Sequence, residues 1–366
     1  MLALVSHRLP DFPWDTLADV TTQANAHPDG IVDLSVGTPV DGTPEFIQDA
    51  LASASNAPGY PTVWGSQVLH EAIIAYLDAR WGAPELTRRH VASAVGTKEV
   101  VGLLPTLLAL GPSDLVVIPS LAYPTYEVGA VMAGIPFERC DDPADVVGKP
   151  ALIWINSPAN PHGAVLGVDE LRAWVAFARQ SGAVLASDEC YGEFGWDAEP
   201  VSVLDKRVND GDLTGLLGVF SASKRSNLAG YRAGFMAGDP DLVQELVAVR
   251  KHLGLMVSAP VQAALAAALG DQAHVDAQRA RYARRRDVMR TALAGAGFRI
   301  EDSQGGLYLW ATKDEPGRDS VAWLAARGIL TAPGDFYGPA GVNFIRVAMT
   351  ATDERIDAAA ARLSQP

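Results

Sequence analysis

The chain has 366 residues, of which 48% are hydrophobic and 20% charged, so we expect a large buried core and two lobes. Its formal net charge of −14 argues against nucleic acid or an anionic membrane surface as a partner. No stretch approaches the roughly 18 consecutive apolar residues of a membrane span, and residues 1–10 lack the pattern of an export signal. Cys140 and Cys190 have no metal-ligand spacing. These features predict a globular, cytoplasmic protein with reduced thiols and no metal site.

The chain starts with a predicted arm that holds a short helix. Segment 9–14 contains two prolines, which exclude a regular helix there. Phe12 and Trp14 need apolar cover, which could come from their own domain or from a second subunit. Residues 31–36 are predicted to form a short strand that leads to a turn at Gly37, where a ligand could approach the backbone closely.

Helices are predicted next over residues 44–55 and 66–80, with Tyr60 in the loop between them. Strands and helices then alternate from about residue 91 to residue 240. The strands are expected at residues 91–95, 114–119, 151–156, 183–186, 216–220 and 233–237, and the helices at 99–110, 128–133, 168–180 and 240–252. This alternation predicts an α/β fold with a large, doubly wound, mostly parallel sheet, which binds ligands at the carboxyl ends of its strands.

The remainder of the chain changes character. Residues 260–294 are predicted to be nearly all helical, and the basic run at 279–290 is interpreted as a solvated helix face. Short strands are expected at 298–300, 306–311, 329–331 and 344–347, which predicts a smaller α+β lobe. The predicted domains are residues 1–35 as the arm and part of the small domain, 36–255 as the large domain, and 256–366 as the small C-terminal domain.

An apolar strand leads into a turn of small residues that carries Lys224. Hydroxyls flank this lysine at Ser221, Ser223 and Ser226, and Arg232 follows. A lysine can form an imine with an aldehyde, and serines together with an arginine suit a phosphate. Pyridoxal phosphate carries both groups, whereas the alternative interpretation is a solvated surface turn.

Other strand ends carry further candidate groups. Small residues at 96–98, between a strand and a helix, can present free N–H groups to an anion. Tyr123 could stack on a flat cofactor, whereas Tyr126 is interpreted as core packing. Asn160, which precedes a proline, could direct its amide to a ring oxygen or lie in a plain loop. Asp188 ends a buried strand, where a charge is costly without a cationic partner.

Arg346 lies inside an apolar strand of the predicted small lobe. A buried guanidinium is costly unless it is paired, so this position predicts either a bidentate carboxylate clamp or a structural salt bridge. Because the net charge is strongly negative, binding of an acidic substrate requires positive charge that is concentrated locally.

Four motifs occur in one order along the chain. They are Asn-Pro-x-Gly at 160–163, Ser-Asp-Glu-x-Tyr at 187–191, Ser-x-Ser-Lys at 221–224 and Gly-x-Arg-x-Gly at 230–234. Together they resemble the class I/II aminotransferases, which are fold type I pyridoxal-phosphate enzymes. The resemblance covers nearly the whole chain.

The resemblance implies a role for each matching residue. Lys224 forms the imine with the cofactor and then moves a proton from Cα of the amino acid. Asp188 faces the pyridine nitrogen and keeps it protonated, which makes the ring a better electron sink. Tyr191 and Asn160 hydrogen-bond the phenolic oxygen of the ring, and Tyr123 stacks on the ring face. Catalysis is thus expected from Lys224, Asp188 and Tyr191.

The same resemblance implies a phosphate site and a substrate site. The residues expected at the phosphate are Gly96, Thr97, Lys98, Ser221, Ser223 and Arg232. Tyr60 reaches the phosphate of the neighbouring subunit, which implies a homodimer with shared sites. Arg346 binds the α-carboxylate of the substrate together with Gly37 and Asn160.

Two N-terminal segments, Leu-Pro-Asp-Phe-Pro-Trp-Asp at 9–15 and Leu-Ser-Val-Gly-Thr-Pro-Val-Asp at 34–41, further resemble a subgroup of this family, the actinobacterial N-succinyldiaminopimelate aminotransferases of lysine biosynthesis. This implies N-succinyl-2-amino-6-oxopimelate as acceptor and glutamate as donor, which becomes 2-oxoglutarate. Lys98 and Arg225 are conceivable partners for the distal carboxylates. The alternatives are an aminotransferase for aromatic or aspartate substrates, a carbon–sulfur β-lyase, and a ligand-sensing regulator, for which the chain lacks room for a DNA-binding module.

Overall fold

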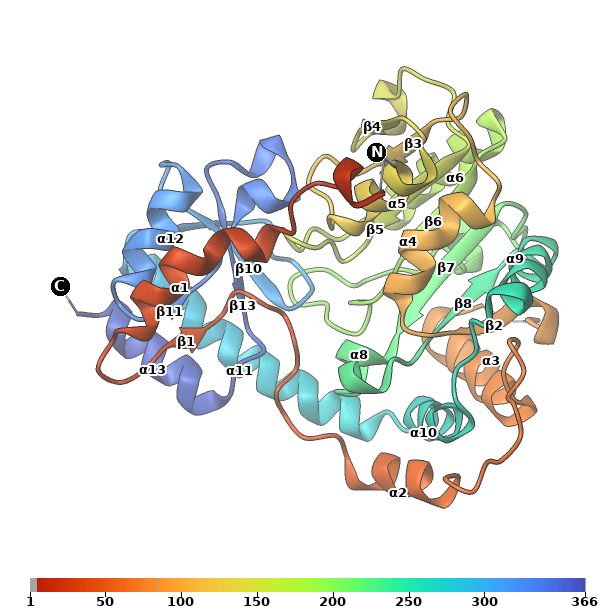
Figure 1. The fold of residues 1–366 in the computed structure, drawn as a ribbon, viewed down its shortest axis with the longest axis horizontal. Coiled ribbons are helices and arrows are strands. Elements are labelled where there is room, and N and C mark those ends of the chain that lie inside the picture. The colour runs from red at the N-terminus through yellow and green to blue at the C-terminus, as the bar shows by residue number, and fades with distance from the viewer. Residues whose placement is uncertain (1–4, 84, 366) are drawn as a thin grey trace.

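The computed structural model describes residues 5–83 and 85–365, which form two lobes side by side (Figure 1). In these residues the larger lobe is built on a seven-stranded sheet in the order β2-β8-β7-β6-β5-β3-β4. Neighbouring strands are parallel except where β8 pairs with β2 and β7. The strands are β2 (Val91–Ala94), β3 (Val116–Ile118), β4 (Phe137–Arg139), β5 (Leu152–Asn156), β6 (Val184–Asp188), β7 (Leu216–Ser221) and β8 (Gly234–Gly238). The predicted large, mostly parallel sheet is confirmed.

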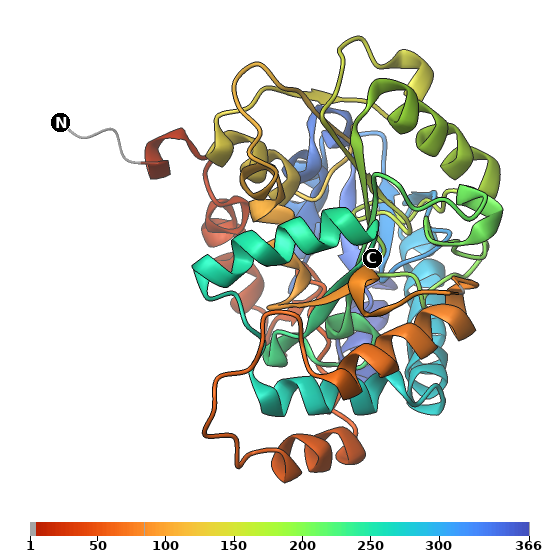
Figure 2. The same cartoon turned by 90° about the vertical axis from the view of Figure 1, so that its right-hand side faces the viewer.

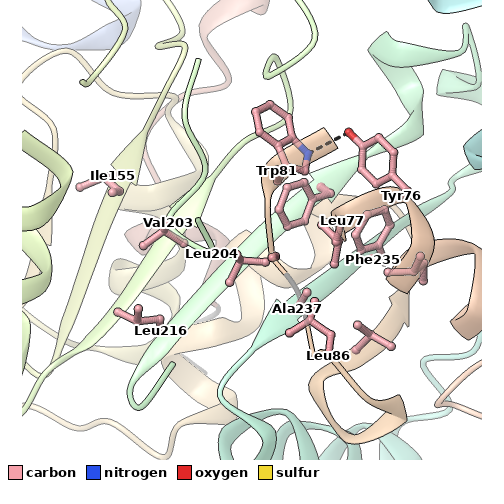
Figure 3. Packing of buried hydrophobic residues seen from close by; sticks show 14 of the residues in the cluster. Tyr76, Leu77, Trp81, Leu86, Ile155, Val203, Leu204, Leu216, Phe235 and Ala237 are labelled. Carbon is pink, nitrogen blue, oxygen red and sulfur yellow. Dashed lines mark hydrogen bonds between the residues drawn. The ribbon is translucent and has the colours of Figure 1, made fainter. Parts of the chain in front are cut away.

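Helices cover both faces of this sheet, and two apolar clusters fill the space between. Side chains alternate along β5, so Ile153 and Ile155 enter one cluster while Leu152 and Trp154 enter the other. The first cluster contains α2 (Glu45–Ser53), α3 (Gln67–Trp81), α6 (Val168–Ser181) and α10 (Ala259–Leu269), and the second α4 (Thr97–Leu107), α5 (Thr125–Ala133) and α9 (Pro240–Leu253). Figure 3 shows part of the first cluster, and Figure 2 shows α3, α9 and α10 on the outer side of the larger lobe.

The smaller lobe combines both ends of the chain. Its antiparallel sheet has the order β12-β13-β10-β9, and β1 (Val32–Asp33) pairs in parallel with β11 (Ile329–Leu330). The other elements are α1 (Ala18–Asn25), α11 (Ala273–Gly295), β9 (Arg299–Glu301), β10 (Tyr308–Thr312), α12 (Gly317–Ala325), β12 (Ala332–Pro333), β13 (Ile345–Ala348) and α13 (Asp353–Leu363). The exact domain limits stay a prediction. One helix of the predicted small domain, α10, packs in the core of the larger lobe.

Among the elements that differ from the predicted ones are β4, α4 and α5. No strand is predicted at Phe137–Arg139, where β4 forms an edge of the sheet; its half-exposed Phe-Glu-Arg sequence has no apolar run. The helices α4 and α5 begin earlier than predicted, at Thr97 and Thr125. In consequence Thr97 lies in the first turn of a helix and Tyr126 within one. No helix among the described residues is long and apolar enough to cross a membrane.

The interpretation of the basic run as a solvated helix face is wrong for two of its arginines. Arg285 and Arg286 are buried on the inner side of α11. Arg285 donates to both oxygens of Asp41, at 2.7 and 2.8 Å, and to Asp353 at 2.6 Å. Arg286 pairs with Asp197. The run spans more than one helical turn, so its charges point both to solvent and to acidic residues of other segments.

Candidate active site

Lys224 lies where β7 passes into the short helix α8 (Ala222–Arg225). The Ser221 hydroxyl caps this helix by accepting from the Ser223 backbone N–H at 3.1 Å. The Lys224 amine donates to the carbonyl of Gly37, which lies 187 residues earlier in the chain. Burial lowers the pKa of Lys224, and the positive charges of Arg346 and Arg232 lower it further. The alternative of a solvated turn is therefore wrong, and the lysine is suited to act as nucleophile or base.

Asp188 is the last residue of β6, in the middle of the sheet, and is only 7% exposed. Its carboxylate accepts from the Tyr126 hydroxyl at 2.8 Å and from the Cys190 backbone N–H at 3.2 Å. Burial raises its pKa. In the described residues Asp188 takes part in no ion pair. A buried carboxylate with neutral donors alone is suited to receive a cationic group of a ligand.

Tyr126 is more than the core residue that the sequence suggested. Its ring stacks on Trp154 at 5.1 Å between centroids, as core packing requires, but its hydroxyl donates to Asp188. A fully buried tyrosine needs a partner for its O–H group. A tyrosine expected in the core therefore indicated that a hydrogen-bond partner exists. The local sequence did not identify this partner, which is 62 residues away.

An anion cradle forms at the N-terminus of α4. Gly96 caps this helix with a φ of +69°, and a Cβ at this position would overlap the Arg232 guanidinium. Thr97 lies beside Gly234 and contacts the Cys190 sulfur at 3.2 Å. A helix N-terminus and an arginine together favour an anion such as a phosphate. The structure thus brings together residues 96–97, predicted from one motif, and Arg232, predicted from another.

The other predicted cofactor residues have different surroundings. Ser223 is buried in α8, and its backbone N–H donates to the hydroxyl of Ser221, the N-cap residue of this helix. Tyr123 is half-buried beside Tyr126, with ring centroids 5.8 Å apart, and the exposed Lys98 amine is 6.0 Å from the Tyr123 ring. Tyr60 is 96% exposed, so within its own chain it lies open to solvent.

Arg346 and Asn160 meet across the two lobes. Arg346, on β13, is 2% exposed; it donates to the Asn160 side-chain oxygen at 2.8 Å and to the Ser35 carbonyl at 2.6 Å. Among the described residues it has no acidic partner, so the alternative structural salt bridge is not found there. Its guanidinium faces neutral acceptors and keeps a buried Nε without a partner. This arrangement is suited to a carboxylate ligand.

Tyr308 was not singled out from the sequence, although it touches several predicted site residues. Its hydroxyl is 2.9 Å from that of Tyr191, and the Arg346 guanidinium lies 4.0 Å from its ring. Gly37 has no room for a side chain, because a Cβ would overlap the Tyr308 hydroxyl. Burial alone would raise the pKa of Tyr308, but the charges of Arg346 and Lys224 outweigh it and lower that pKa. The local pattern showed only an apolar strand, so no signal in it marked this residue.

The described side chains thus offer three groups to one ligand. The buried Lys224 amine suits an aldehyde, the buried Asp188 carboxylate suits a ring cation, and the cradle of Arg232 and the α4 N-terminus suits a phosphate. Pyridoxal phosphate carries all three.

The model of the family "Aminotransferase class I and II" matches residues 29–363. The chain belongs to this family. Class I and II aminotransferases depend on pyridoxal phosphate, exchange amino groups between amino and oxo acids, and commonly form homodimers, so the predicted family, fold type and cofactor are confirmed.

Individual relatives agree with this family. The aminotransferase is 60% identical over 361 residues to "Probable aminotransferase Rv1178" of Mycobacterium tuberculosis, covering 98% of this chain and 86% of that protein. It is 56% identical over 357 residues to 4-dedimethylamino-4-oxo-anhydrotetracycline transaminase OxyQ of Streptomyces rimosus, covering 97% and 99%. Among solved structures, substrate-bound BacF of Bacillus subtilis has a TM-score of 0.90 at 26% identity, covering 100% of this chain and 97% of that one.

Proposed function

We propose that this aminotransferase transfers the amino group of glutamate to N-succinyl-2-amino-6-oxopimelate in lysine and diaminopimelate biosynthesis, in the cytoplasm. The observation that supports an amino acid as substrate is the buried pair of Arg346 and Asn160 beside Lys224. The pimelate acceptor is supported by the N-terminal resemblance. More distant relatives include LL-diaminopimelate aminotransferase of Dehalococcoides mccartyi, at 29% identity over 378 residues.

The side chains would divide the work as follows. Arg346 holds the α-carboxylate with two parallel N–H groups, which orients Cα toward Lys224. The uncharged form of the Lys224 amine would take the proton from Cα, and burial favours this form because it lowers the pKa of the amine. Bound pyridoxal phosphate supplies the electron sink that makes this proton acidic. The Asp188 carboxylate would stabilise a positive charge on the ring nitrogen of the bound cofactor. The Tyr191 hydroxyl, whose pKa burial raises well above its usual value, stays a hydrogen-bond donor.

Three buried polar atoms around the clamp support a polar substrate. The Arg346 Nε, the Tyr337 hydroxyl and the Trp14 indole nitrogen have no hydrogen-bond partner within the described part of the chain. The Tyr337 and Trp14 rings lie 5.0 and 6.0 Å from the Arg346 guanidinium. Buried donors of this kind are costly until a ligand oxygen satisfies them. Of the two aromatic residues of the arm, Trp14 packs against Phe336 of its own chain, whereas Phe12 is 56% exposed.

A second candidate acceptor is a polycyclic ketone. The name of the relative OxyQ denotes a transaminase of an oxo-anhydrotetracycline, and that protein matches this chain over nearly its whole length. The aromatic rings of Trp14, Phe336 and Tyr337 beside the clamp would also suit a flat substrate.

An acceptor panel tests the substrate proposal. With glutamate as donor, we expect kcat/KM for N-succinyl-2-amino-6-oxopimelate to exceed that for oxaloacetate, phenylpyruvate and an oxo-anhydrotetracycline by at least about tenfold, or about 1.4 kcal/mol. The measurement is 2-oxoglutarate formation by the purified holoenzyme. A higher value for the polycyclic ketone would favour the second candidate. Pyruvate and ammonia formed from cystathionine without an oxo acid would instead favour a β-lyase.

If the two subunits share each active site, Tyr60→Phe should weaken cofactor binding. The hydroxyl of Tyr60 would bind the phosphate in the partner subunit, and loss of a hydrogen bond to a charged group costs about 1.5–3 kcal/mol. We therefore expect cofactor affinity to fall by about ten- to a hundredfold. Val147→Ala, at another exposed apolar side chain, is the control.

Subunit mixing shows whether Tyr60 acts across the interface. A hybrid of one Tyr60→Phe subunit and one Lys224→Ala subunit would contain one site with both Tyr60 and Lys224 intact. We expect such hybrids to regain activity at a cofactor concentration that limits the Tyr60→Phe homodimer. Absence of regained activity in a hybrid dimer shown to have formed would mean that Tyr60 does not act in this way.

A further inference from the structure

The side chain that follows Lys224 turns away from the site. Arg225 is 4% exposed, so it is not available for a distal carboxylate, and that interpretation is wrong. All three guanidinium nitrogens donate hydrogen bonds to other protein groups. Their acceptors are Glu193 at 3.0 Å, Ser226 at 3.2 Å, the Ala268 carbonyl at 2.6 Å, the Asp271 carbonyl at 3.2 Å and the Gln272 side chain at 3.2 Å.

The carboxylate of Glu193 is the central acceptor of this buried network. It lies two residues after Tyr191 and accepts from Arg225, from Arg80 at 3.1 Å and from the Tyr76 hydroxyl at 2.9 Å. The Tyr76 hydroxyl in turn accepts from the Trp81 indole N–H at 3.1 Å, as Figure 3 shows. One carboxylate thus receives two guanidinium groups and a phenol, which fixes its position.

The network continues from the Lys224 turn to the start of α11. The Ser226 hydroxyl lies 2.9 Å from Nε2 of His274, and Nδ1 of that ring lies 2.7 Å from Asp271. Hydrogen bonds from the His274 backbone and side chain lower the pKa of Asp271, so this carboxylate only accepts. Nδ1 therefore carries the hydrogen, and Nε2 accepts from Ser226. α11 is the long helix that enters the smaller lobe (Figure 1).

The ion pair of Arg225 and Glu193 links the two turns that carry Lys224 and Tyr191. Lys224 and Arg225 are consecutive in α8, after β7, whereas Tyr191 and Glu193 lie in the turn after β6. On the front of these turns are Lys224 and the Tyr191 hydroxyl, which meets Tyr308. The buried ion pair links the two turns, so a displacement of one turn relative to the other would disturb this contact.

We propose that Arg225 is a positioning residue, which fixes the Lys224 amine relative to Tyr191 through Glu193 and anchors both to the connection between α10 and α11. This inference rests on the proposed role of Lys224. Arg225 acts through its neighbours and would not touch substrate or cofactor. A lysine in its place would keep the charge but could not reach five acceptors in fixed directions.

Arg225→Lys tests this role in the holoenzyme. We expect kcat to fall by about ten- to a hundredfold, since small displacements of catalytic groups have effects of this size. KM for glutamate should change by less than about threefold, because Arg346 is untouched. The visible absorbance of the bound cofactor should persist with a shifted pH midpoint, since it reports the surroundings of Lys224. Arg362→Lys is the control, because Arg362 is a buried arginine that donates to backbone carbonyls in the smaller lobe.

Glu193→Gln gives an independent test if Arg225→Lys does not fold. It keeps the size of the side chain but weakens both guanidinium contacts, and the same fall in kcat and shift of the midpoint are expected. In the double variant, the two effects should not add, because both substitutions remove one connection. An unchanged kcat and midpoint in either folded variant, or effects no larger than those of Arg362→Lys, would overturn the proposal. If Lys224→Ala remained active, the proposed function itself would fail.

Discussion

Lys224→Ala is expected to reduce kcat by about 10⁴-fold, the upper end of the range for general acid–base catalysis. The amine of Lys224 is the base of the site, with a pKa that burial lowers, whereas Lys98, the other lysine predicted at the site, has an exposed side chain. The visible absorbance of the lysine-bound cofactor should disappear as well. The measurements are steady-state turnover and an absorbance spectrum of the dialysed protein.

Two further variants sharpen this result. Lys149→Ala removes an exposed lysine from a surface loop and should leave both readouts unchanged. Lys224→Arg keeps the positive charge beside Gly37, but a guanidinium is not deprotonated in proteins, so it should be as inactive as the alanine variant. Turnover and absorbance that persist in Lys224→Ala would reject the assignment.

Asp188→Asn is expected to lower kcat by about 10²–10³-fold, as loss of one preorganised electrostatic contact does elsewhere. The amide has the size of the carboxylate and its oxygen can still accept from Tyr126, so the fold should persist. It lacks the negative charge that would hold a protonated ring nitrogen. Turnover and cofactor retention after dialysis measure the effect. Tyr126→Phe, which removes only the hydroxyl, should have a smaller effect, and an equal effect would contradict the proposed role of the charge.

In the cofactor-free protein, Asp188→Asn should increase stability, although the same substitution lowers kcat of the holoenzyme. Burial raises the pKa of Asp188 in the folded state, so folded wild-type protein binds its proton more tightly than the unfolded chain does. The ionised carboxylate then destabilises the fold at pH values above this raised pKa. We expect the variant to have the larger free energy of unfolding at pH 8, and the difference to shrink as the pH falls toward about 4, the ordinary carboxyl pKa. Urea unfolding of the two apo proteins at several pH values measures this.

The amino-acid sequence was sufficient to predict the large sheet and every strand in it except β4. Lys224, Asp188 and the glycine before α4 each follow an apolar run, and parallel strands bring such residues to one edge. Their residue types then indicated the chemistry, because an amine, a buried carboxylate and an anion cradle suit one cofactor. The residue types and apolar runs are local features, whereas their assignment to one cofactor came from the order of the four motifs, which resembles the class I/II aminotransferases.

The contacts between distant side chains became visible only in the folded chain. The contact of Tyr126 with Asp188, that of Tyr308 with Tyr191, and that of Arg346 with Asn160 join residues 62, 117 and 186 positions apart. Arg225 looked like a free cation, and only the fold showed it bound behind the site to Glu193. Local patterns predict the type of an element, but the burial and the partner of a charged side chain depend on which faces of sheet, helix and lobe pack together. Such long-range pairing leaves no periodic trace along a single chain.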